Sequence, residues 1–83
     1  MVAVYIILTH YGTYYTGMTN SIIRRWSEHV NGQSSYLRRV PAKEVVHLEF
    51  WPNYSIASSR ERYIKRMGAR VFLVKSQYST SVL

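Results

Sequence analysis

The chain has 83 residues, no cysteine, and eleven Lys and Arg against four acidic residues, which give a formal net charge of +7 and a pI near 10.1. This length suffices for one small domain over residues 1–83 with a thin core, and the lack of cysteine excludes disulfide frameworks and thiolate metal sites. The charge favours a polyanionic partner, although a basic surface that merely keeps the protein in solution would explain it too.

Signals for secretion or membrane insertion are not recognisable in the sequence. Residues 1–8 are apolar but lack the basic start and the cleavage site of a signal peptide. No apolar run approaches the ~20 residues that span a bilayer. We therefore expect a soluble, intracellular protein of the cytoplasm that does not contact a membrane.

The chain is predicted to begin with a β-hairpin. Val2–Leu8 is a continuous apolar run rich in β-branched residues, which is typical of a buried strand. His10–Thr13 is a turn in which Gly12 can adopt a positive φ. Tyr14–Met18 then returns as the second strand, and the hairpin brings the two strands side by side.

A helix is predicted next, over Ser21–Val30, with a stop signal at the Asn-Gly pair that follows it. Arg25 and His29 lie one turn apart at the rim of the apolar face, while Arg24 and Glu28 are spaced to pair on the solvated side. The apolar residues that recur at helical spacing are Ile22, Ile23, Trp26 and Val30.

A basic loop follows, over residues 33–42, and ends next to Lys43. It contains Arg38 and Arg39 and shows little periodicity. A solvated connection explains this composition, and contact with phosphate is the second interpretation.

The second half is predicted as a strand, Glu44–Trp51, and a helix, Ile56–Met67. The strand would carry Val46, Leu48 and Phe50 on one face and Val45, His47, Glu49 and Trp51 on the other. The helix would bury a stripe formed by Ala57, Ile64 and Met67. Glu61 lies at the edge of that stripe, and Arg60 lies within it. We expect the stem of Arg60 to pack while its charged head extends to water.

The C-terminal part is ambiguous in the sequence. Val71–Val74 favours a strand by propensity. Residues 76–83 are rich in Ser, Thr and Tyr, and we expect them to fray.

Two tyrosine-containing triplets carry a resemblance to a known family. Ala3-Val4-Tyr5 and Tyr15-Thr16-Gly17, followed by Arg25, His29 and Glu61, resemble the signature of the GIY-YIG nuclease superfamily over residues 4–65. The likeness is greatest to the small stand-alone members. Two departures are visible: Ala3 stands where the family usually has glycine, and residues 69–83 lack the asparagine that many longer members place there.

The resemblance implies an α/β module, with a small three-stranded, mainly antiparallel sheet flanked by helices and a short closing helix near the C-terminus. It also implies that Tyr5 and Tyr15 orient or deprotonate the attacking water, without deciding which one is the base. From propensity alone, both tyrosines are ordinary core residues of strands. A phenol titrates near pH ~10, so it needs nearby cations to act as a base.

The remaining site residues have similar pairs of interpretations. The resemblance implies that Arg25 binds the scissile phosphate and that His29 is a hydrogen-bond donor or proton relay; a surface imidazole is the alternative for His29. Glu61 would bind Mg²⁺ or Mn²⁺, because one carboxylate with waters and substrate oxygens forms a normal magnesium site. Otherwise it is a helix glutamate that pairs with Lys65.

The function that these interpretations predict is a divalent-metal-dependent DNA endonuclease. Duplex or branched DNA would be hydrolysed in repair or recombination, and selectivity would come from DNA shape, dimerisation or a partner protein. The residues predicted to contact DNA are Gly17, Arg24, Arg38, Arg39, Lys43 and Lys65. The alternative is a non-catalytic nucleic-acid-binding module that retains the fold and its basic surface.

Overall fold

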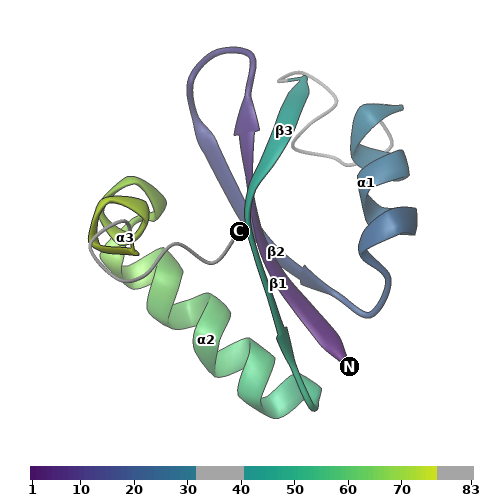
Figure 1. Cartoon of the computed structure of the whole chain (residues 1–83), viewed down its shortest axis with the longest axis vertical. Helices are drawn as coiled ribbons and strands as arrows, with labels where there is room; N and C mark the ends of the chain where they lie inside the picture. The colour runs from purple at the N-terminus through teal and green to yellow at the C-terminus, as the bar shows by residue number, and fades with distance from the viewer. Residues whose placement is uncertain (32–40, 77–83) are drawn as a thin grey trace.

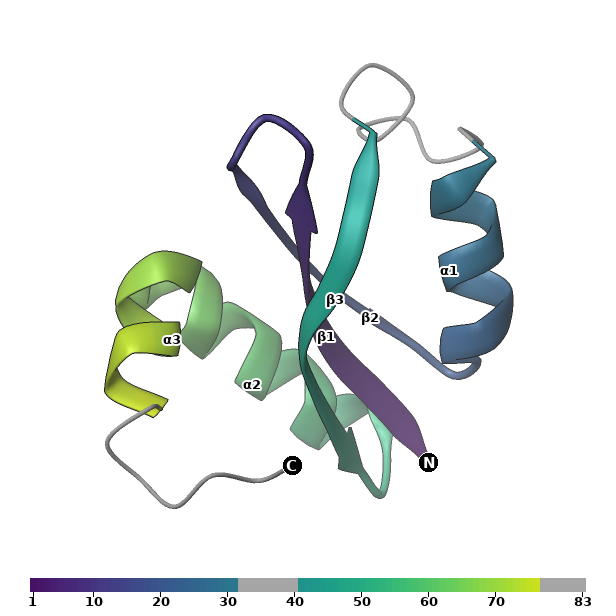
Figure 2. The same ribbon diagram turned by 45° about the horizontal axis from the view of Figure 1, so that its top comes forward.

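The computed structural model describes residues 1–31 and 41–76 and shows an antiparallel sheet between helices (Figure 1). Its strands are β1 (Val2–Thr9), β2 (Tyr14–Thr19) and β3 (Ala42–Trp51), in the order β2-β1-β3. Its helices are α1 (Ile22–Val30), α2 (Tyr54–Met67) and α3 (Ala69–Ser76). In both views α1 lies on one face of the sheet, and α2 and α3 lie on the other (Figures 1 and 2). The predicted fold class is confirmed.

The central strand β1 supplies the core on both faces of the sheet, because its side chains alternate and nearly all are buried. Facing α2 and α3, the buried cluster consists of Val2, Val4, Ile6, Ala57, Ile64 and Phe72. Facing α1, Tyr5 and Ile7 form a smaller cluster against Ile22, Trp26 and Val45. The polar hydroxyl of Tyr5 is therefore placed inside the protein, beneath α1.

Helix α1 presents a different face to the sheet from the one predicted. Ile22 and Trp26 pack inward as expected, but Ile23 is 83% exposed and Val30 is 55% exposed. His29 is buried in their place. The residues at i, i+4 and i+7 from Ile22 therefore face the sheet. A histidine can occupy the last of these positions because Tyr5 provides a hydrogen-bond partner there.

Strand β3 contains irregularities that correct its predicted faces. Ile6 pairs with His47, whereas Ile7 pairs with Val45, so the register skips one residue at Val46. Such a bulge turns the side chains on its two sides relative to a regular strand. Val46 therefore packs with Trp51 in the cluster facing α2 and α3, and Val45 packs on the α1 side. Each of the two valines thus lies on the opposite face from the strand residues with which it was predicted to align. The strand also begins two residues earlier than predicted.

Helix α2 also begins two residues earlier than predicted, at Tyr54, since the Asn53 Oδ1 accepts a hydrogen bond from the Ile56 N–H at 3.0 Å. It ends before Gly68, whose φ of +93° suits glycine. The following residues form α3, so the strand that propensity favoured at 71–74 is wrong and the implied closing helix is present. Within the described residues, no helix is long and apolar enough to cross a membrane.

The expectation for Arg60 is wrong in one respect. Its guanidinium is not extended to water: Nε donates to the Glu49 carboxylate at 2.7 Å, and the group lies over the rings of Trp51, Tyr63 and Phe72. A carboxylate on β3 and an aromatic surface offer the head more than solvent does.

Candidate active site

The centre of the candidate site is a hydrogen bond between β1 and α1. The Tyr5 hydroxyl lies 3.0 Å from His29 Nε2, and both residues are almost completely buried. Gly17 is the cross-strand partner of Tyr5 on β2. A Cβ added to Gly17 would lie 2.6 Å from the Tyr5 oxygen, so the absence of a side chain there makes room for the phenol.

Tyr15 lies next to this pair. Its ring centroid is 6.3 Å from that of Tyr5 and 5.3 Å from that of His29, and it is less buried than either. The hairpin thus brings the two signature tyrosines together, as predicted. The interpretation of His29 as a surface imidazole is wrong, because its ring is enclosed between α1 and the sheet.

The electrostatic environment keeps the tyrosine–histidine pair neutral. Burial, followed by the neighbouring Tyr15, raises the pKa of Tyr5, and the negative charges of Glu61 and Glu28 add to this effect, whereas Arg25 opposes it. Burial and the positive charge of Arg25 lower the pKa of His29. A protonated phenol and a neutral imidazole can share one proton along their hydrogen bond, and the tautomer of His29 decides which of them donates.

Arg25 contributes a cation at the edge of this site. Its Nη1 pairs with Glu28 at 3.2 Å, so the predicted pairing of Glu28 with Arg24 is not the one that forms. Arg24 instead donates to the Asn20 amide oxygen at 3.0 Å on the exposed side of α1. Among the described residues, Arg25 Nε and His29 Nδ1 are buried without a hydrogen-bond partner. The site thus holds polar atoms that still have donor or acceptor capacity.

Glu61 and Lys65 reach the same region from α2. The Lys65 Nζ lies 3.7 Å from the Glu61 carboxylate, and the Glu61 side chain is only 18% exposed. The predicted i, i+4 pairing therefore forms. The charge of Glu61 also acts on the Tyr5 phenol, which places this carboxylate within electrostatic reach of the buried pair.

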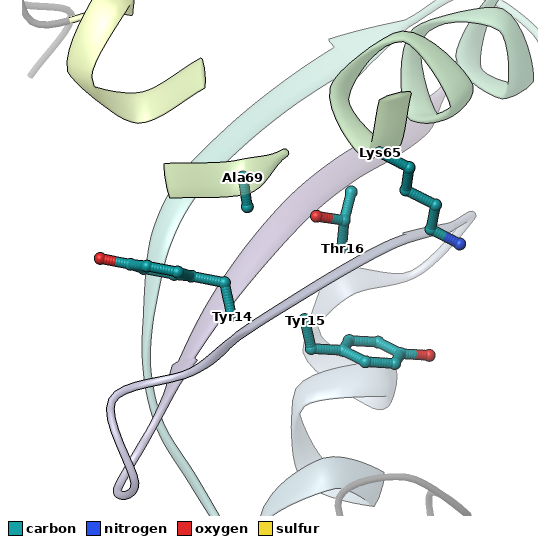
Figure 3. A pocket seen from close by; sticks show the side chains of 5 residues that line it. All are labelled: Tyr14, Tyr15, Thr16, Lys65 and Ala69. Carbon is teal, nitrogen blue, oxygen red and sulfur yellow. The ribbon is translucent and has the colours of Figure 1, made fainter. Parts of the chain in front are cut away.

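Residues from the two faces of the sheet can meet here because β2 is an edge strand. Tyr15 extends from β2 on the side of α1, while Lys65 extends from α2 on the other side, and their polar ends point in the same direction (Figure 3). A pocket of about 310 Å³ opens at this edge, and its lining residues are Tyr14, Tyr15, Thr16, Lys65 and Ala69. The candidate site therefore crosses the β2 edge.

The other residues predicted to contact DNA are distributed differently. Lys43 lies on the opposite edge strand, β3, next to a second pocket formed with α1, and it is not brought together with Lys65. Arg38 and Arg39 lie outside the described residues, as do residues 77–83 of the tail. At Gly17, another residue predicted to contact DNA, the space that a side chain would fill is taken by the tyrosine rings.

Two contributors to this edge were not found from the sequence. Tyr14 lines the pocket, and the Arg70 guanidinium of α3 lies 5.5 Å from the centre of its ring. The repeated tyrosine at 14–15 was a signal, since neighbouring strand residues face opposite sides. No local pattern marks Arg70, because its role depends on how α3 packs.

The donor set suits a hard divalent cation bound by few protein ligands. Within residues 1–31 and 41–76 there is no cluster of three or more His, Cys, Asp or Glu that could enclose a metal. Glu61 supplies a single partly buried carboxylate, which is the arrangement Mg²⁺ accepts when waters and substrate phosphate complete its shell. The residues present therefore fit such an ion.

Comparison with known proteins finds relatives over most of the chain. A model of the GIY-YIG catalytic domain matches residues 1–72. A UPF0213 protein of Clostridium perfringens is 38% identical over 65 residues, which cover 77% of this chain and 70% of that protein. A UPF0213 protein of Xanthomonas axonopodis pv. citri is 33% identical over 64 residues, which cover 76% of this chain but only 63% of that relative.

A solved structure shows the same fold. The solution NMR structure of a UPF0213 protein from Bacillus halodurans superimposes with a TM-score of 0.58 at 27% identity, covering 99% of this chain and 89% of that one. The matched family consists generally of endonucleases, so the fold is of the nuclease type and implies a nucleic-acid substrate. The chain belongs to the GIY-YIG catalytic domain family and is a relative of the UPF0213 proteins.

Proposed function

We propose that this protein is a divalent-metal-dependent DNA endonuclease that hydrolyses phosphodiester bonds at the β2 edge. The observation that supports it most is the convergence of Tyr5, Tyr15 and His29 with an arginine on one side and a glutamate on the other. A module that only binds nucleic acid gains nothing from a carboxylate next to phosphate, because the two charges repel.

The proton route follows from the hydrogen bond between the buried pair. As water attacks phosphorus, its proton passes to the Tyr5 oxygen, and the phenolic proton passes to His29 Nε2 across 3.0 Å. The lowered pKa of His29 leaves its imidazole neutral and able to accept. The bond from phosphorus to the leaving sugar oxygen breaks, and that oxygen takes a proton from solvent. Tyr15, the more exposed tyrosine, orients the water.

Charge is handled by the residues around this route. Arg25 binds the non-bridging oxygens of the scissile phosphate and stabilises the charge that develops there. Glu61 would hold Mg²⁺ or Mn²⁺, which supplies positive charge to the phosphate and lowers the pKa of bound water. Lys65, beside Glu61, limits the repulsion between that carboxylate and the DNA.

The test is the variant Glu61→Gln, which keeps the size and helix propensity of the residue and removes the charge. We expect cleavage of duplex, branched and single-stranded DNA in Mg²⁺ or Mn²⁺ to be lost, while DNA affinity in Ca²⁺ is kept or increased. Mn²⁺ should broaden the NMR signals of residues near Glu61 in the wild type and not in the variant.

The matched control is Glu44→Gln, since Glu44 is an exposed glutamate of β3. It should cleave and bind Mn²⁺ as the wild type does. If Glu61→Gln cleaves DNA at the rate of the wild type, Glu61 is not the metal ligand. A wild-type protein that cuts none of these substrates would favour the non-catalytic binding module instead.

A further inference from the structure

The pocket at the β2 edge, which we call the β2–α3 pocket, adjoins the candidate site and shares two residues with it. Lys65, one of its lining residues, is the residue that pairs with Glu61, and Tyr15, another, packs on His29. A DNA strand whose scissile phosphate lies at Tyr15 and Glu61 would continue past this pocket on one side. Its volume of about 310 Å³ is at the lower end of the ~300–1,000 Å³ range of ligand pockets.

The chemistry of the lining matches one nucleotide. The Lys65 ammonium, whose side chain is 56% exposed, stands at the rim where a phosphate would lie. Tyr14 and Ala69 provide apolar surface on which a sugar or base can pack (Figure 3). Arg70 adds a second cation above the Tyr14 ring, 5.5 Å from its centre.

The surrounding helices strengthen this match through their charge. Arg60 is neutralised by Glu49, and the single acid of α2 and α3, Glu61, is offset by Lys65. The further basic residues of these helices, all of them exposed, are Arg62, Arg66, Arg70 and Lys75. A polyanion approaching the β2–α3 pocket therefore meets a positive field.

Another pocket differs in the charge of its lining within the described part of the chain. It lies between α1 and β3, with a volume of about 340 Å³, and its lining is largely apolar. Among residues 1–31 and 41–76, its charged lining residues are Lys43 and Glu44, which cancel one another in net charge. Of the two pockets, only the β2–α3 pocket combines a cationic rim with a position beside Glu61.

We propose that the β2–α3 pocket binds the deoxynucleotide next to the scissile phosphate, with Lys65 holding its phosphate and Tyr14 packing on its sugar or base. The bound strand then crosses the β2 edge towards α3, away from Lys43. That the adjacent phosphate is the one cut rests on the proposed nuclease function. Binding of a nucleotide in the pocket does not rest on that function, and it can be measured without cleavage.

The experiment is a titration of the ¹⁵N-labelled full chain with hexathymidylate in Ca²⁺, followed by NMR. The amide signals of Tyr14, Thr16, Lys65 and Ala69 should shift together and saturate, and inorganic phosphate at the same concentration should not reproduce these shifts. Lys65→Gln should weaken binding and reduce the slope of log affinity against log salt by about 0.7, the share of one phosphate contact on a single strand.

The matched control is Lys75→Gln, which removes the same charge from an exposed position of α3 outside the pocket. It should leave the pocket shifts unchanged. Shifts confined to the α1–β3 pocket, at Ile22, Trp26 and Val45, would overturn the proposal, and so would Lys65→Gln binding with wild-type affinity and slope. Pocket shifts without any DNA cleavage would refute the nuclease function alone.

Discussion

Arg60 of α2 donates a hydrogen bond from its Nε to the Glu49 carboxylate of β3 at 2.7 Å. Arg60 directly precedes the candidate metal ligand Glu61 in the sequence. Glu49 also accepts hydrogen bonds from His47 Nε2 at 2.8 Å and Trp51 Nε1 at 2.7 Å. Burial alone would raise the pKa of Glu49, but these three donors outweigh it and lower the pKa to about 2. The pair thus attaches α2 to the sheet at the point from which Glu61 projects.

Glu49→Gln should therefore destabilise the protein in a pH-dependent way. The carboxyl has a lower pKa folded than unfolded, so its contribution is present above about pH 4.5 and is lost as the pH falls towards about 2. We expect the variant to lose up to about 3 kcal/mol of unfolding free energy at pH 7 and to show a shallower acid dependence below pH 4.5. Urea denaturation at several pH values measures both, with the exposed Glu44→Gln as control. Parallel pH curves for wild type and Glu49→Gln would contradict this account.

Gly17→Ala should damage both folding and cleavage. The new Cβ would lie 2.6 Å from the Tyr5 oxygen and 2.8 Å from its Cζ, and the buried ring cannot move without losing His29. We expect a loss of about 1–3 kcal/mol, typical of overpacking, together with reduced turnover. Gly12 is the contrast, because it has a φ of +80° and open space around it in the described residues. Gly12→Ala should cost about 1 kcal/mol in backbone strain and leave cleavage intact. Equal turnover of Gly17→Ala and wild type would show that the ring can shift.

Removal of the Tyr5 hydroxyl should cost more stability than the sequence suggested. If Tyr5 were only an ordinary core residue of a strand, as propensity alone predicts, Tyr5→Phe would leave folding nearly intact. In the structure, this change leaves His29 Nε2 buried without its partner, which costs about 1–3 kcal/mol. Tyr15→Phe, at a less buried position, should cost less. Each variant should cleave about 10²- to 10⁴-fold more slowly if its phenol handles the attacking water. Thermal melts beside single-turnover rates separate the two effects, and a variant with the wild-type rate would identify its tyrosine as a packing residue.

The stability of the protein should fall on mild acidification because of His29. Burial and Arg25 lower its pKa in the folded state, so the unfolded chain binds more protons as the pH drops below about 6.5. The free energy of unfolding should therefore decrease from pH 7.5 to pH 5. His29→Gln should flatten this decrease, whereas His10→Gln, at an exposed position of the hairpin turn, should retain it. The same slope in all three proteins would mean that His29 titrates normally.

Arg25 and Arg24 form a matched pair for separating catalysis from general attraction. Arg25 lies beside the tyrosine–histidine pair, whereas Arg24 is held by Asn20 on the exposed side of α1. Arg25→Gln should lower the cleavage rate by a factor of about 10²–10³, the effect of removing one preorganised donor. Arg24→Gln should leave the rate at saturating DNA unchanged and at most reduce the salt slope by about 0.9 on a duplex. Single-turnover kinetics and anisotropy titrations measure these effects, and equal losses of rate in both variants would remove Arg25 from the site.

The amino-acid pattern was enough to predict every element of this fold except α3, and to identify the residues at its centre. The apolar run of β1, the turn at Gly12 and the stop at Gly68 are local signals, because each depends on the conformational preferences of a few neighbouring residues. The order of Tyr5, Tyr15, Arg25, His29 and Glu61 identified the family for the same reason, since it is written along the chain.

How these elements face one another depends on contacts between residues that are distant along the chain. Ile23 and His29 exchanged their expected environments because a hydroxyl from β1 lies beneath α1, and helical periodicity carries no information about that partner. The bulge at Val46 and the inward turn of Arg60 likewise depend on residues distant in sequence. Lys65 and Tyr15 likewise line one pocket only because β2 is an edge strand and helices cover both faces of the sheet. Long-range packing supplies the energy for each of these arrangements, so no short stretch of sequence encodes them.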